Sequence, residues 1–243
     1  MRQALFVVAL LTAPALAAAP RPVPASDLLI SHSSPEIAWR WRMSPEAARA
    51  PALLAAMRVE ALQAAAKARA AAANDAASAR KAGFPFRPHD VIIDWSIAAD
   101  TPHLLALIGD SFSFTGGAHG NTGFATRIWD KSARRSIAID ALFNDWPRAR
   151  KIIEPVYCKA LADEQARRLG ERPRDDMHTC PKLSDVPVAP FAGKGRRASQ
   201  LQVLLAPYAA GAYAEGPYVI TLPWPETVRP FVKPGFRGDL FGE

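Results

Sequence analysis

The architecture of the chain follows from residues 103–129, which read HLLALIGDSFSFTGGAHGNTGFATRIW. Two runs rich in apolar, β-branched and aromatic residues, 103–114 and 122–129, flank a loop that holds three glycines. Such runs joined by a short glycine-containing connection are typical of a β-hairpin. Similar runs at 91–97 and 136–139 lie on either side. The sequence therefore predicts an antiparallel meander of four strands.

A strand and a long helix are expected before the meander. Residues 37–42, IAWRWR, alternate apolar and charged side chains, as a half-buried strand does. Ser44 followed by Pro45 is a typical helix start, with a hydroxyl cap and a proline at the first helical position. Alanine, the best helix former, dominates residues 51–81, and Gly83 ends that run. We expect this helix to lie across the sheet.

The second half of the chain predicts a helix followed by further strands. Residues 147–169 have helical spacing of apolar side chains, 182–197 are expected as loop, and 201–205 and 218–222 as strands. The whole order is strand, long helix, meander, helix, strands. It predicts the α+β class, in which an antiparallel sheet carries a long Ala-rich helix and a second helix packed against it.

The first residues predict export. Residues 1–19 have one positive charge, a short apolar run and small residues at Ala17–Ala19, which is the pattern of a cleaved signal peptide. Residues 20–34 are expected as a linker because prolines hold an extended conformation. No apolar stretch beyond the leader is long enough to span a membrane. We therefore expect a periplasmic or secreted protein without a stable membrane span.

The remainder is expected as two parts of one compact unit. The N-terminal part, 35–135, holds the long helix and the meander, and the C-terminal part is 136–243.

Two cysteines, Cys158 and Cys180, lie in the part expected to reach an oxidising compartment. A disulfide between them is the simplest interpretation. It would close a loop of roughly 20 residues, which contributes about 3 kcal/mol in the chain-entropy model. A zinc site that includes His178 is the weaker alternative, because the close cysteine pair of zinc motifs is missing.

The formal net charge is +7. Small basic clusters occur at 134–135, 167–168 and 194–197. Since an exported protein rarely meets nucleic acid, none is expected as a partner. Anionic polymers of the envelope or membrane surfaces are alternatives to a simple solvated basic surface.

The loop between the two strands of the hairpin holds the candidate contact residues Gly116, Gly117, His119 and Gly120. Its glycines permit backbone conformations that other residues avoid. His119 could clasp the loop by hydrogen bonds. A structural role is the main interpretation, a partner contact the second, and catalysis or metal binding the third. No motif supplies a catalytic set, a cofactor site or a metal site.

Several segments together resemble a known family. They are the run FTGGAHG at 114–120, the turn WDK at 129–131, the run APYAAGAYAEGPY at 206–218 and ITLPW at 220–224. The chain resembles the RsiV-like extracytoplasmic domain family. That family includes the sensor domain of a lysozyme-sensing anti-sigma factor and the non-catalytic region preceding the catalytic domain of the peptidoglycan deacetylase PdaC.

The resemblance implies a non-enzymatic binding or sensing module of the bacterial cell envelope. Its implied partners are a peptidoglycan-related glycan or a lysozyme-like protein. The chain departs from both named proteins because it lacks the transmembrane and sigma-binding segments of the one and the deacetylase domain of the other. The alternatives are a cell-wall hydrolase or deacetylase that uses His119, and a structural assembly factor of the envelope.

Overall fold

A computed structural model describes residues 24–173 and 175–242. The predicted signal peptide, 1–19, lies outside the described residues. The elements in chain order are β1 (Leu29–Ser33), β2 (Ile37–Met43), α1 (Pro51–Ala82), β3 (His89–Asp100), β4 (Leu104–Phe114), β5 (Asn121–Asp130), β6 (Arg135–Ile137), α2 (Trp146–Leu169), β7 (Val188–Phe191), β8 (Gln200–Leu205), β9 (Tyr218–Pro223) and α3 (Pro234–Phe241), with short 3-10 turns between them.

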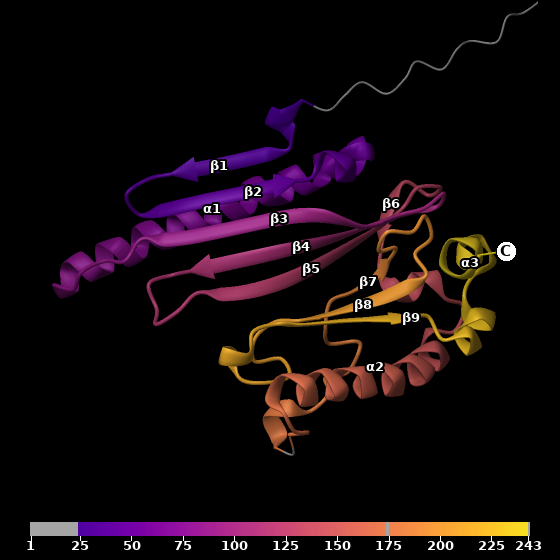
Figure 1. The fold of residues 1–243 in the computed structure, drawn as a ribbon. Helices are drawn as coiled ribbons and strands as arrows, with labels where there is room; N and C mark the ends of the chain where they lie inside the picture. The colour runs from indigo at the N-terminus through magenta and orange to yellow at the C-terminus, as the bar shows by residue number, and fades with distance from the viewer. Residues whose placement is uncertain (1–23, 174, 243) are drawn as a thin grey trace, which may run out of the picture.

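The molecule is built in layers. A six-stranded sheet in the order β1-β2-β3-β4-β5-β6 has α1 against one face, and a three-stranded sheet, β7-β8-β9, lies on its other side with α2 beyond it. Figure 1 shows this succession of helix, sheet, sheet and helix. The predicted α+β class is confirmed. The sequence predicted one sheet with both helices packed against it, whereas α2 packs on a second, three-stranded sheet.

One pairing in the large sheet differs from the prediction. The meander from β3 to β6 is antiparallel, but β2 pairs with β3 in parallel, with Trp41 opposite Ile93. The reason is α1, whose 32 residues carry the chain back along the sheet before β3 begins. The sheet is therefore mixed rather than purely antiparallel.

The first core lies between α1 and the sheet. The alternation of β2 buries Trp39, Trp41 and Met43 on the inner face, and α1 adds Leu53 and Met57 among its buried side chains. Local sequence sets the ends of the two helical segments here. Ser44 accepts a hydrogen bond from the backbone N–H of Ala47, and Gly83 ends α1 with φ +73°, a conformation that suits glycine.

The second core lies between the two sheets and under α2. It contains Ala106 and Ile128 from the large sheet, Val203 from the small sheet, and Ile153 and Leu161 from α2. This core draws on residues of both predicted parts, 35–135 and 136–243, and β6 spans the boundary between them.

Three elements were not predicted. The segment expected as a linker, 20–34, contains β1, whose five residues show no buried side chain and form the edge of the large sheet. The segment expected as a loop, 182–197, contains β7. Pro190 argues against a strand in the sequence, but β7 lies at the edge of the small sheet, where proline is tolerated. The short helix α3 follows Lys233. Within residues 24–173 and 175–242, no helix combines the length and the apolar character that crossing a membrane requires.

Candidate functional site

The hairpin loop between β4 and β5 is shaped by its glycines. Gly116 has φ +86°, which other residues rarely adopt. The carbonyl oxygen of Gly117 accepts a hydrogen bond of 2.8 Å from Nη1 of Arg87. A Cβ atom at Gly120 would lie 2.3 Å from the ring of Phe112, so this position has no room for a side chain unless that ring moves. Gly116 and Gly120 therefore meet local requirements for a glycine, whereas a Cβ atom at Gly117 would meet nothing within 4 Å.

His119, at the tip of the loop, is exposed and stacks on Tyr213. The ring centroids are 3.8 Å apart, and Nδ1 of His119 lies 3.0 Å from the carbonyl oxygen of Gly120. The Tyr213 hydroxyl donates a hydrogen bond of 2.6 Å to the same carbonyl oxygen. The loop between β8 and β9 thus reaches the hairpin across 93 residues of sequence. The sequence suggested that His119 holds the loop by hydrogen bonds. The hydrogen bond that links the loop to another part of the chain is instead donated by Tyr213.

Tyr208 completes this group of rings. Its centroid lies 5.5 Å from that of Tyr213 and 6.4 Å from that of His119, and 60% of the residue is exposed. Its backbone has φ +72°, a strained conformation for a residue with a side chain. Such strain occurs preferentially at functional sites. We refer to His119, Tyr208 and Tyr213 as the aromatic cluster.

A buried polar network holds the loop that carries the two tyrosines. The carboxylate of Glu215 accepts hydrogen bonds from the backbone N–H of Ala212, at 2.6 Å, and from the hydroxyl of Tyr218. Arg168 of α2 lies over the ring of Tyr218 and donates to the carbonyl oxygens of Glu215 and Pro217. Burial and the hydrogen bond to Glu215 raise the pKa of the Tyr218 hydroxyl to about 12, so it stays a donor.

His178 joins this network to a second segment. Its Nδ1 lies 2.7 Å from Oδ1 of Asp175, and its Nε2 lies 3.0 Å from Oε1 of Glu215. Only the doubly protonated ring can donate to both carboxylates. The hydrogen bond with Asp175, followed by that with Glu215, accordingly raises the pKa of His178 against the opposing effect of burial.

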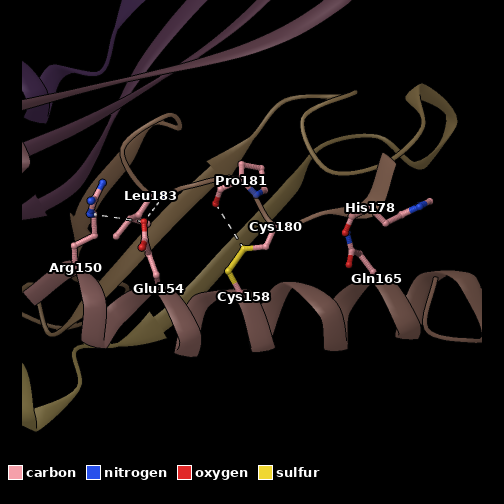
Figure 2. Close-up of a disulfide and its surroundings, with 8 residues drawn as sticks. All are labelled: Arg150, Glu154, Cys158, Gln165, His178, Cys180, Pro181 and Leu183. Carbon is pink, nitrogen blue, oxygen red and sulfur yellow. Dashed lines mark hydrogen bonds and ion pairs between the residues drawn. A yellow bond between two sulfur atoms is a disulfide. The ribbon is translucent and has the colours of Figure 1, made fainter. Parts of the chain in front are cut away.

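The disulfide predicted from the sequence is present and fixes the segment that carries His178 (Figure 2). Cys158 on α2 is bonded to Cys180, and their Cα atoms are 5.5 Å apart. On one side, Glu154 accepts a hydrogen bond from the backbone N–H of Leu183. On the other, the Gln165 amide donates to the carbonyl oxygens of His178 and Ala210. Helix α2 therefore anchors the segment that carries His178 and, through the carbonyl oxygen of Ala210, the loop that carries the two tyrosines.

Two aspartates near the start of α2 and most of the tryptophans lie at a helix start, in a 3-10 turn or in the cores. Asp145 caps α2 by accepting from the backbone N–H of Arg148, whereas Asp140 lies in a 3-10 turn and caps nothing. Most of the tryptophans are buried and cannot form a surface platform: Trp39, Trp41, Trp129 and Trp224. Among residues 24–173 and 175–242, no group of three or more His, Cys, Asp or Glu side chains could hold a metal ion.

One pair of carboxylates was missed in the sequence. Asp94 and Asp110 lie directly opposite each other on β3 and β4. Partial desolvation, followed by repulsion from Asp94, raises the pKa of Asp110, although the residue is exposed. Asp94 itself forms ion pairs with Arg42 and Arg40 of the neighbouring strand. The pair depends on the strand register, which no local pattern reveals.

Comparison with known proteins supports the same assignment of fold. Residues 45–122, which include α1 and the hairpin loop, match the family described as deacetylase PdaC. A DUF3298 family protein from Pseudomonas aeruginosa is similar in structure, with a TM-score of 0.52 and 15% identity over 86% of this chain and 94% of that one. A DUF3298 family member from Bacteroides fragilis has a TM-score of 0.56 and 13% identity over 89% and 96%. No curated protein matches the chain.

These matches confirm the resemblance seen in the sequence. Residues 45–122 are similar to the PdaC family, and the fold is similar to that of the two DUF3298 proteins.

Proposed function

We propose that the chain is an exported binding module of the bacterial cell envelope, and that its aromatic cluster binds a peptidoglycan-related glycan. The observation that carries the proposal is the exposed, strained Tyr208 beside the stacked pair of His119 and Tyr213. Tyrosine offers an apolar ring and a hydrogen-bonding hydroxyl together, which suits the faces and hydroxyl groups of a sugar. The disulfide and buried network behind the cluster hold these rings in place before a ligand arrives.

Three observations support the location. Residues 1–19 have the pattern of a signal peptide, and the cysteines are paired, as is usual in an oxidising compartment. Residues 45–122 match the family described as deacetylase PdaC, and the resemblance of the sequence is to a peptidoglycan deacetylase, whose substrate lies in the envelope.

A binding role agrees better than catalysis with the surroundings of His119. Its contacts are the ring of Tyr213 and the carbonyl oxygen of Gly120. Among the residues that the structure describes, no carboxylate lies within ion-pair distance of this imidazole. A general base needs a partner that orients it and a nucleophile within reach.

The test measures binding of purified muropeptides by calorimetry to protein purified from the periplasm of cells that express the full chain. Tyr208→Ala removes the ring but keeps a side chain at the strained position, and we expect it to weaken binding about tenfold. Leu62→Ala is the matched control, because Leu62 is 53% exposed on α1, and it should bind as the wild type does.

Two further arms address the alternatives. Hen lysozyme replaces the muropeptides in one arm, and saturable lysozyme binding without glycan binding would contradict the glycan proposal. In the other arm, the protein is incubated with muropeptides with and without zinc, and products are followed by chromatography. Release of acetate or the appearance of shortened glycan strands would contradict the binding proposal and favour the hydrolase or deacetylase alternative.

A further inference from the structure

Basic side chains gather at the end of the large sheet away from the aromatic cluster. Strand β4 runs from the turn at 101–103 to the hairpin loop at 115–120, so these two turns lie at opposite ends of the strand. The β5–β6 turn and α3 lie at the same end as the turn at 101–103 (Figure 1). Two basic clusters seen in the sequence, 134–135 and 194–197, contribute to this end although they are about 60 residues apart.

Two neighbouring hollows are lined by these side chains. The larger, of about 800 Å³, has Arg49, His103, Arg196 and Arg197 on its wall. The smaller, of about 400 Å³, has Lys131 and Arg134, and the Arg49–Asp100 pair borders both hollows. We refer to the two hollows together as the basic groove.

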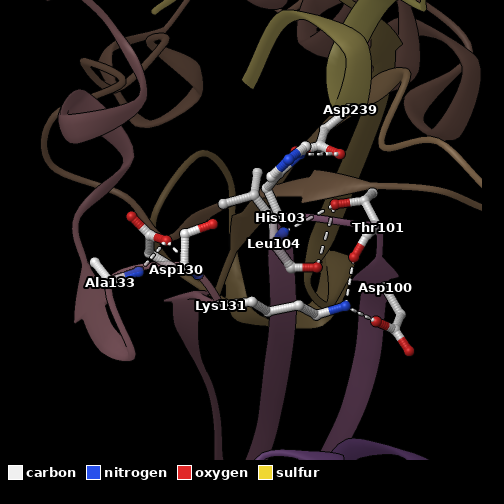
Figure 3. Close-up of polar contacts among 9 residues, drawn as sticks. Asp100, Thr101, His103, Leu104, Asp130, Lys131, Ala133 and Asp239 are labelled. Atoms are coloured by element: carbon white, nitrogen blue, oxygen red, sulfur yellow. Dashed lines mark hydrogen bonds and ion pairs between the residues drawn. The ribbon is translucent and has the colours of Figure 1, made fainter. Parts of the chain in front are cut away.

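The carboxylates of the groove are already engaged. Asp100 forms ion pairs with Arg49, at 2.8 Å, and with Lys131. Asp239 is only 2% exposed, and its carboxylate holds Nδ1 of His103 at 3.1 Å. Figure 3 shows the Asp100–Lys131 and Asp239–His103 pairs at this end of the sheet. The His103 side chain is half exposed and lines the larger hollow.

Three arginines of the groove form no such ion pair. Over residues 24–173 and 175–242, no carboxylate lies within ion-pair distance of Arg134, Arg196 or Arg197, and all three are exposed. Arg134 has φ +53° in a turn that Asp130 fixes by accepting from the backbone N–H groups of Ser132 and Ala133, as Figure 3 shows for Ala133. Each of the two hollows is therefore lined by at least one arginine whose charge is available.

We propose that the basic groove binds a phosphate-bearing ligand. Guanidinium groups match the oxygens of phosphate by paired, charge-assisted hydrogen bonds. A phosphate monoester carries a charge of roughly −1.5 to −2 near neutral pH, so it attracts exposed guanidinium groups more strongly than a single carboxylate does. The groove is distinct from the aromatic cluster, so this site is independent of glycan binding there. A phosphorylated saccharide and a phospholipid headgroup share the required chemistry.

The primary experiment titrates inorganic pyrophosphate into protein purified from the periplasm, at low ionic strength. The double variant Arg134→Gln with Arg196→Gln should bind at least about tenfold more weakly, since it removes two charge-assisted contacts. The matched control is Arg69→Gln with Arg80→Gln, which removes the same charge from exposed positions further along α1 and should leave affinity unchanged. Binding should also weaken as sodium chloride is raised.

Three results would overturn the proposal: no saturable binding by the wild type, an unchanged affinity in the groove variant, or an equal loss in both double variants. Equal losses would mean that net charge alone attracts the anion. Circular dichroism and thermal melts confirm that each variant is folded before its affinity is compared.

A second arm separates the two sources of phosphate. Co-sedimentation with phosphatidylglycerol vesicles, compared with phosphatidylcholine vesicles, detects a lipid headgroup. Sedimentation that requires phosphatidylglycerol and is lost in the groove variant identifies a lipid source. Pyrophosphate binding without such sedimentation identifies a free phosphorylated compound, and both outcomes support the groove as the site.

Discussion

Nε2 of His178 lies 3.0 Å from Oε1 of Glu215, and this contact joins two segments that carry different parts of the site. His178 belongs to the stretch that the disulfide fastens to α2, and Glu215 belongs to the loop that presents Tyr208 and Tyr213. Both side chains are about nine-tenths buried. The position of the aromatic cluster therefore depends on the contact between His178 and Glu215, whose charges change with pH.

The first prediction concerns pH. The pKa of His178 is raised by its hydrogen bonds with Asp175 and Glu215, so its contribution to stability is complete below its unfolded pKa of about 6.5 and is lost as pH rises through the folded value. Burial would raise the pKa of Glu215, but hydrogen bonds from Tyr218, Ala212 and His178 lower it, and that of Asp175 is lowered chiefly by His178. Their contributions are lost as pH falls below about 4.

The network is therefore most stable between about pH 4.5 and 6.5. The melting temperature of the wild type should exceed that of His178→Gln most clearly near pH 6, and the difference should shrink by about pH 8.5. Melts over this range measure it, with His32→Gln as the control. A difference that is the same at every pH would contradict the prediction.

The second prediction concerns the disulfide. Its cysteines are 22 positions apart, and closing a loop of this size contributes about 3 kcal/mol in the chain-entropy model. We expect Cys158→Ser with Cys180→Ser to lower the free energy of unfolding by about that amount. Denaturant titration measures the change, and mass spectrometry of non-reduced peptides from the wild type must show the linked pair. Two free thiols in the periplasmic protein would refute the pairing.

The third prediction separates Tyr213 from His119. Tyr213→Phe removes the hydroxyl that binds the Gly120 carbonyl oxygen, and we expect it to cost about 1 kcal/mol of stability. His119→Ala removes an exposed ring whose polar contact is with the adjacent residue, and it should cost about 0.5 kcal/mol or less. Thermal melts of both variants test the order, and a larger loss in His119→Ala would reverse it.

The fourth prediction concerns the strained backbone of Tyr208. Tyr208→Gly removes the side chain that disfavours φ +72°, so stability should be unchanged or should rise by up to about 1 kcal/mol. The same variant should lose affinity for muropeptides as Tyr208→Ala does. A clear fall in melting temperature would show that the exposed ring stabilises the fold, and it would remove the strain argument for function.

The fifth prediction concerns the close approach of Trp95 to Gly109. A Cβ atom at Gly109 would lie 2.8 Å from Cε2 of the indole, with two more ring atoms at 2.9 Å. Gly109→Ala should therefore displace the indole, destabilise the fold by roughly 1–3 kcal/mol and change the tryptophan fluorescence. Gly235→Ala is the control, because a Cβ atom there would meet nothing within 4 Å. Equal stability of the two variants would count against this packing.

Much of the first layer could be predicted from the sequence because its signals are local. These signals are the alternation of apolar and charged residues in β2, the alanine content of α1 and the turn residues of the meander. Each can be recognised from a short stretch of sequence. β1 and β7 lacked such a signal. Both are short strands at the edge of a sheet, and they form because a neighbouring strand is there to pair with. β1 has no buried side chain and β7 contains a proline, so neither shows the alternation of buried and exposed residues that is typical of a strand.

The site could be predicted only in part for the same reason. The sequence predicts the hairpin loop with His119, but the contact of this loop with Tyr213 depends on how the two sheets stack. The same holds for His178 with Glu215 and for the basic groove, whose residues come from distant turns. Contacts between separate elements have no sequence period that would reveal them.

The parallel pairing of β2 with β3 also constrains the order in which the protein folds. The paired residues Trp41 and Ile93 are separated by the whole of α1, whereas β4 and β5 are joined by a six-residue connection. Closing a long loop has a greater entropic cost than closing a short one, and pairings between distant residues form slowly. The antiparallel meander can therefore act as the nucleus on which β2 docks after α1 has formed. Mutations in the β4–β5 hairpin should slow folding, while those in β1 and β2 should chiefly speed unfolding.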